Sequence, residues 1–102
     1  MKVEILSTAE DDLVDGHGFY ERQKPGVGMY SLDTLFSEID SLKLYAGTHK
    51  RKWGKFRMLS KLFPFGVFYT IEKDTVYVIA VLDLRRRPSP KNHNKTELEE
   101  IG

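Results

Sequence analysis

The chain has 102 residues and no cysteine, so we expect one small domain without a disulfide framework, a thiolate zinc site or a cysteine nucleophile. Apolar residues make up 40% and charged residues 30% of the chain, which excludes an intrinsically disordered protein. The net charge of +1 hides an asymmetry: residues 1–48 hold four basic and nine acidic side chains, and residues 49–102 hold twelve basic and six acidic ones. This pattern fits either two solvated faces of opposite sign or a surface for an anionic partner.

The sequence gives no sign of a membrane segment. No stretch has the ~18 consecutive apolar residues that a membrane-spanning helix needs. The N-terminus turns acidic within its first residues, which is unlike a signal peptide. We therefore expect a soluble, cytoplasmic protein with no membrane partner.

The first elements in chain order are a strand and a helix. Residues 2–6 alternate polar and apolar side chains, which predicts a short strand with Val3 and Ile5 facing inward. Ser7 and Glu10 have the spacing of a capping box, in which a hydroxyl and a carboxylate satisfy each other's backbone amides, so a helix should start there. The residues predicted on its buried face are Ala9, Leu13, Gly16 and Tyr20.

Two features of this helix need an explanation. Gly16 and Gly18 each cost about 1 kcal/mol relative to alanine, so either another element approaches closely there or the helix is locally weak. Four acidic residues lie in its first turns, where the helix dipole favours negative charge. The dipole is a sufficient structural reason for Glu10, Asp11, Asp12 and Asp15.

A second helix follows a tight connection at residues 25–26, which hold Pro and Gly. Its predicted apolar positions are Met29, Leu32, Leu35, Phe36, Ile39 and Leu42. The polar residues predicted to face away are Ser31, Asp33, Ser37, Glu38 and Asp40. Because so few residues join the two helices, we expect an antiparallel helical hairpin.

The second half of the domain is predicted to be strand. Residues 55–61, 65–71 and 75–82 have strand composition, and residues 72–74 join the last two as a hairpin. Residues 76–82 are almost continuously apolar, which predicts an interior strand. The expected fold is therefore α+β, in the order β-α-α-β-β-β, with a helical hairpin packed on one face of a small, mainly antiparallel sheet. We expect a domain at residues 1–88 and a polar C-terminal tail at residues 89–102.

Two basic clusters could meet on this sheet. The first places three cations on the strand face that points away from the helices: Lys55, Arg57 and Lys61. The second follows the last strand and consists of Arg85, Arg86 and Arg87. If they converge, they suit a polyanion such as RNA or an acidic partner peptide. Trp53 could stack on a base, although packing beside its loop is the commoner role.

Familiar enzyme signatures are missing from the sequence. It contains no HExxH, no GxSxG and no glycine-rich phosphate loop. Three scattered histidines do not make a metal site, so we expect neither a metal nor another cofactor.

Four pieces of sequence, taken in order, resemble the RelE/ParE superfamily of toxins from type II toxin–antitoxin systems, and the ParE branch most closely. They are residues 7–13 (STAEDDL), 23–28 (QKPGVG), 59–69 (LSKLFPFGVFY) and 78–88 (VIAVLDLRRRP). The resemblance spans nearly the whole chain up to Pro88, and the family has the β-α-α-β-β-β fold expected above. The chain departs from the ParE-like pattern at Asp83 and Arg87, where the family more often has His and an acid.

The resemblance implies a growth-inhibiting toxin of the plasmid-stabilisation type, neutralised by a cognate antitoxin that lays a helix and a strand over it. ParE-like members bind DNA gyrase without known hydrolytic chemistry. RelE-like members cut mRNA on the ribosome with basic side chains and no metal. We expect the ParE-like mode, with Arg57, Lys61, Arg85, Arg86 and Arg87 contacting the target or the antitoxin, in a homodimer or a toxin–antitoxin hetero-oligomer.

The alternative is a RelE-like endoribonuclease, which needs a base for the 2′-hydroxyl, cations for the phosphate and an acid for the leaving oxygen. Lys55 or Lys61 could be the base, since neighbouring cations lower the pKa of a lysine. Arg57 and Arg85 could hold the phosphate, and His93 is the candidate acid. A third interpretation is a small RNA-binding module that is not toxic.

Overall fold

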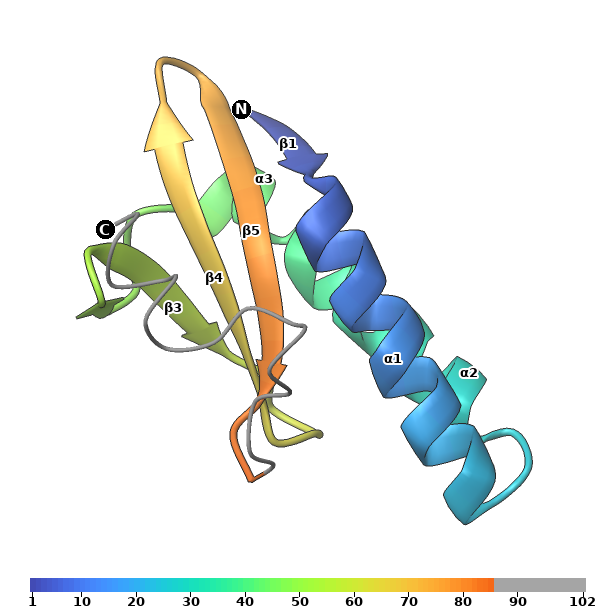
Figure 1. Ribbon diagram of the computed structural model, residues 1–102. Helices are drawn as coiled ribbons and strands as arrows, with labels where there is room; N and C mark the ends of the chain where they lie inside the picture. Colours follow the sequence, from blue (N-terminus) through green and yellow to red (C-terminus); the bar gives the residue numbers. More distant parts are fainter. Residues whose placement is uncertain (86–102) are drawn as a thin grey trace.

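The computed structural model describes residues 1–85. Their fold is α+β and follows the predicted β-α-α-β-β-β order, with a short third helix and a two-residue strand added between the helical hairpin and the last three strands (Figure 1). The elements are β1 (Lys2–Ile5), α1 (Ser7–Gln23), α2 (Val27–Asp40), α3 (Leu42–Tyr45), β2 (Arg51–Lys52), β3 (Lys55–Leu59), β4 (Phe65–Glu72) and β5 (Thr75–Asp83).

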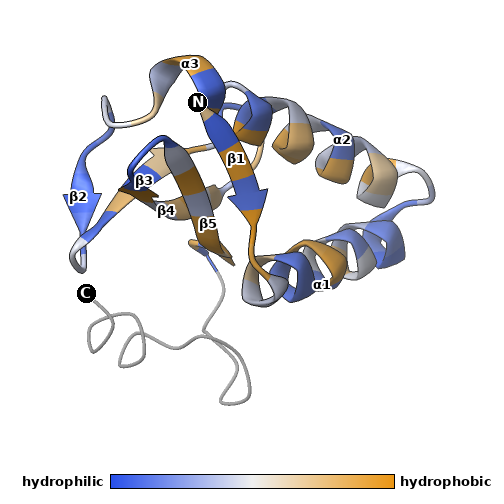
Figure 2. Ribbon diagram, turned by 90° about the horizontal axis from the view of Figure 1, so that it is seen from above, coloured by the Kyte–Doolittle hydropathy of each residue, from blue (hydrophilic) through white to orange (hydrophobic). Residues whose placement is uncertain are grey.

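The five strands form one sheet in the order β1-β5-β4-β3-β2. All neighbours are antiparallel except β1 and β5, which are parallel. The helices lie on one side of this sheet, and no helix of the described residues covers the other side (Figure 2). As predicted, β5 is an interior strand, and β4 and β5 are joined by a tight turn at residues 73–74.

The main hydrophobic core lies between the helices and the sheet. Tyr69, Val67 and Val78 from the central strands are fully buried in it, and Val3 and Ile5 pack against its margin as predicted. Helices contribute Ala9, Leu13, Leu35, Ile39 and Leu42. Each buried aliphatic side chain of this kind stabilises the fold by roughly 1.5–3 kcal/mol.

Two side chains of α1 hold it against the edge of β5. The parallel pairing with β1 ends at Val78, and a register shift follows in the pairing of β5 with β4. Beyond that point the Thr8 hydroxyl donates to the Ile79 carbonyl at 2.6 Å, and the Val81 amide donates to an Asp12 carboxylate oxygen at 2.9 Å. Side chains of α1 therefore bond the backbone of β5 beyond the point where its pairing with β1 ends.

The predicted capping box is wrong. α1 begins at Ser7 itself, its N-cap is Leu6, and no side chain makes a capping hydrogen bond there. The helix dipole is also not the whole reason for the acidic group, because Asp12 is only 6% exposed and bonds to the sheet. The contacts with β5 fix the start of the helix in place of a cap.

The glycines in α1 and α2 mark places where elements meet closely. A Cβ on Gly16 would lie 3.1 Å from Cζ of Phe65, so another element does approach the helix there. Gly26 adopts φ 91° in the turn between the helices, a conformation that favours glycine. The Glu21 carboxylate accepts hydrogen bonds from the amides of Gly26 and Gly28, each at 3.0 Å, and so caps the start of α2.

The structure contradicts the predicted positions of three residues of α2. Ser31 was expected to face solvent, but it is 1% exposed and its hydroxyl donates to the Gly28 carbonyl at 2.8 Å. Met29 and Phe36, expected in the core, are 52% and 44% exposed. The close approach of the two helices at Gly28 turns the small residues of α2 inward and leaves these large ones outside.

Candidate functional site

The sheet face opposite the helices carries part of the first basic cluster. Arg57 pairs with Phe68 across β3 and β4, and both side chains point away from the core cluster that contains Phe56 and Met58. Lys55 shares this face by strand alternation and is 3% exposed. Burial, and after it the positive charge of Arg51, lowers the pKa of Lys55 below its ordinary value.

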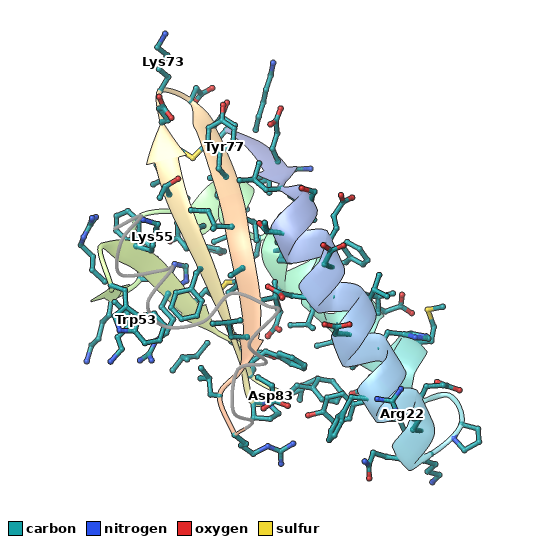
Figure 3. All side chains as sticks on the ribbon, in the orientation of Figure 1. Arg22, Trp53, Lys55, Lys73, Tyr77 and Asp83 are labelled. Carbon is teal, nitrogen blue, oxygen red and sulfur yellow. The ribbon has the colours of Figure 1, made fainter. Side chains whose placement is uncertain are left out.

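Trp53 packs beside this cluster, as expected for the commoner of its two roles. Its indole stacks on the ring of Phe68, with centroids 5.3 Å apart and planes 15° apart. The Lys52 ammonium lies 5.2 Å from the Trp53 ring centroid. Trp53 lies in the β2–β3 turn, and Lys55 begins β3 two positions later (Figure 3). The result is a small second hydrophobic cluster with cations around it.

The structure does not bring Arg85 to the same surface. Its guanidinium donates to the Tyr20 hydroxyl on α1 at 2.9 Å, and its backbone amide donates to Asp83 at 2.9 Å. Tyr20 belongs to the core on the helix side, whereas Arg57 lies on the opposite face. The expected convergence of the two clusters is therefore wrong for this pair. Arg86, Arg87 and His93 lie outside the described residues, as does the expected tail at residues 89–102.

A groove that the sequence did not reveal lies between the second and third helices and the outer edge of β3. Its volume is about 740 Å³. The residues that line it are Ser37, Glu38, Ser41, Tyr45, Thr48, His49, Lys50, Arg57, Met58, Leu59 and Lys61. A second hollow of about 550 Å³ shares Ser37, Glu38 and Lys61 with it and extends along α2 to Tyr30 and Leu62. We call the two together the α2–β3 groove.

Glu38 joins the two walls of the α2–β3 groove. One of its carboxylate oxygens accepts the backbone amide of Lys61 at 2.8 Å. The other oxygen is buried and has no hydrogen-bond partner among the described residues. No sequence signal connects these two residues, which lie 23 positions apart.

His49 and Tyr69 anchor the loop that closes one end of the groove. The Tyr69 hydroxyl accepts the Gly47 amide at 2.9 Å and lies 2.5 Å from Nδ1 of His49. One of these two side chains donates the bond and the other accepts it, according to the tautomer of His49. Burial lowers the pKa of His49 and raises that of Tyr69, in accord with a neutral pair.

The sheet edge along this groove is open beyond β2. β2 pairs with residues 55–56 of β3, and the Arg57 amide reaches back to Lys50. By the two-residue period of a strand, the backbone of Leu59 also faces outward, and no described strand pairs with it. Leu59 and Leu62 are 53% and 62% exposed. The groove thus combines an open strand edge, exposed apolar side chains and three cations.

The described residues contain neither a cluster of metal-ligating side chains nor a membrane-spanning helix. Among residues 1–85, no group of His, Cys, Asp and Glu side chains could hold a metal ion. No helix in that part of the chain is long and apolar enough to cross a membrane.

The fold is α+β, with a five-stranded sheet packed against a helical hairpin. The same architecture occurs in a known toxin–antitoxin system. A chain from the chromosomal ParDE TA system of P. aeruginosa matches with a TM-score of 0.72 and 13% sequence identity, over 79% of this chain and 92% of that one. The chain therefore shares the fold of that ParDE chain, and the α+β fold class predicted from the sequence is confirmed. No protein-family model and no curated protein matches it.

Proposed function

We propose that this protein is the toxin of a type II toxin–antitoxin system, that it is ParE-like, and that it acts in the cytoplasm by binding a target such as DNA gyrase. The observation that carries this proposal is the fold, which matches a ParDE chain over most of both molecules. A cognate antitoxin neutralises it. Binding rather than catalysis fits the separation of Arg57 from Arg85, because these two arginines do not converge on one phosphate.

The α2–β3 groove is the proposed antitoxin site. An extended segment could add to the open edge of β3 by backbone hydrogen bonds while its side chains contact Leu59 and Leu62. Lys50, Arg57 and Lys61 favour an acidic segment, since they outnumber the two acidic residues of the lining, Asp33 and Glu38. In this proposal the antitoxin lies beside the sheet and forms a hetero-oligomer with the toxin.

The second candidate function is a RelE-like, metal-independent mRNA endonuclease. The observation that favours it is Lys55, whose pKa is lowered by burial on the same strand face as Arg57. Lys55 would take the proton of the 2′-hydroxyl, and Arg57 would hold the phosphate. Lys61, the other candidate base, lines the α2–β3 groove, away from Lys55.

Two assays on purified protein separate these functions. The proposal predicts inhibition of gyrase supercoiling and no cleavage of ribosome-bound mRNA. Arg57→Ala should weaken the inhibition, and Lys73→Ala, at the tip of the β4–β5 hairpin (Figure 3), should not. Discrete mRNA cuts on translating ribosomes, lost in Lys55→Met, would instead establish the endonuclease. Inactivity in both assays, with no growth defect on expression, would favour the non-toxic RNA-binding module.

A further inference from the structure

The chain leaves its last strand close to one end of the α2–β3 groove. The Leu84 amide donates to the Pro64 carbonyl at 2.8 Å, just after the end of β5. Pro64 follows Lys61, a lining residue of the groove, by three positions, a span of at most about 11 Å. Leu84, near the end of the described residues, therefore lies close to this end of the groove.

The sequence beyond this point contains an acidic, partly apolar stretch. Residues 86–95 carry Arg86, Arg87, Lys91 and Lys95 and no acidic residue, whereas residues 97–101 read ELEEI. Three glutamates with Leu98 and Ile101 complement a groove that offers three cations beside exposed leucines. The same chain therefore contains a segment with the acidic and apolar side chains that would complement the groove.

The connection is long enough for binding in cis. Twelve positions separate Arg85 from Glu97, and an extended chain of that length spans up to about 40 Å. A covalent connection of this length holds the segment at an effective concentration on the order of millimolar. A contact with a dissociation constant on the order of millimolar would then be occupied in a substantial fraction of the molecules.

We propose that residues 97–101 bind the α2–β3 groove of their own chain and compete there with an incoming acidic segment. The contact itself stands on the groove and the sequence alone. The competition rests on the proposed function, because it requires that the antitoxin uses the same groove. The toxin would then carry a built-in competitor, which the antitoxin must displace.

Paramagnetic relaxation enhancement tests the contact on the full chain. The chain has no cysteine, so Gly102→Cys gives one site for a nitroxide label. We expect selective loss of amide NMR intensity at Thr48, Leu59 and Lys61, and recovery of that intensity at high salt because ionic screening weakens the contact. Intensity loss centred on another surface, or spread evenly over the chain, would overturn the proposal.

Charge-reversal variants provide the matched control. Lys50→Glu with Lys61→Glu should abolish the intensity loss at the groove, whereas Lys2→Glu with Lys73→Glu, the same charge change away from it, should not. Equal loss in both double variants would contradict the proposal. None of these measurements uses the antitoxin or the target, so a failure here leaves the proposed function intact, and a failure of the proposed function leaves the contact intact.

Competition is measured separately with a synthetic acidic strand peptide as the probe. Replacing Glu97, Glu99 and Glu100 by Gln should tighten peptide binding to the full chain by about two- to tenfold, given a tether at millimolar effective concentration. If the labelled tail contacts the groove but the peptide affinity does not change, the competition is refuted and the contact is retained.

Discussion

The buried carboxylate of Asp12 on α1 accepts a hydrogen bond from the backbone amide of Val81 on β5 at 2.9 Å. The two residues are 69 positions apart, and the bond closes the edge of β5 where its pairing with β1 has ended. It fixes the helical hairpin against the sheet, and with it the wall that α2 gives to the groove.

We predict that Asp12→Ala destabilises the fold by about 1–3 kcal/mol, because the Val81 amide is left buried without an acceptor. Asp11→Ala, one residue earlier and exposed, should change the free energy of unfolding by less than about 0.5 kcal/mol. Denaturant unfolding of the two variants measures the difference. Equal effects would show that the bond does not hold the helix.

The glycines of the hairpin predict opposite responses to alanine. A Cβ on Gly28 would lie 2.5 Å from the His17 carbonyl oxygen, so Gly28→Ala should force the helices apart and destabilise by about 1–3 kcal/mol. At Gly18 the nearest atom is the end of the flexible Arg22 side chain at 3.3 Å, so Gly18→Ala should stabilise by up to about 1 kcal/mol. Thermal unfolding gives both signs, and destabilisation by Gly18→Ala as large as that by Gly28→Ala would contradict the packing described.

The His49–Tyr69 pair predicts a loss of stability in mild acid. The pKa of His49 is lowered by burial from its ordinary 6.5, so below that pH the unfolded chain binds more protons than the folded one. This contribution is complete above pH 6.5 and is lost as the pH falls through the lowered value. His49→Gln, which does not titrate, should flatten the dependence of unfolding free energy on pH in that window. If the slope of unfolding free energy against pH does not change, a group other than His49 causes the pH dependence.

Arg57 and Arg85 lie on different faces, so their contributions to binding should be independent. In a double-mutant cycle with Arg57→Ala and Arg85→Ala, we expect the changes in antitoxin binding free energy to add within about 0.5 kcal/mol. Isothermal titration with the cognate antitoxin measures the cycle. A coupling above about 1 kcal/mol would mean that the two guanidinium groups meet on one partner group.

Local sequence patterns predicted the fold well because periodicity and turn residues act over a few positions. The alternation of Val3 with Ile5 and the run at residues 76–82 identified strands that the structure confirms. The same reasoning failed for Ser31, since the inward turn of that side chain depends on the approach of α1 at Gly28.

The candidate groove was beyond sequence reasoning for a related reason. It depends on contacts between distant positions, such as Glu38 with Lys61 and His49 with Tyr69, and no spacing rule connects such pairs. The basic residues themselves were visible in the sequence. Their division between the sheet face opposite the helices, the groove and α1 was not, because it follows from strand register and from the turn after β5.

The proposed role as a toxin is tested most directly by growth after induction. Expressed alone, the chain should arrest growth, and co-expression of a cognate antitoxin should restore it. Normal growth of cells that accumulate the folded protein without any antitoxin would contradict the account.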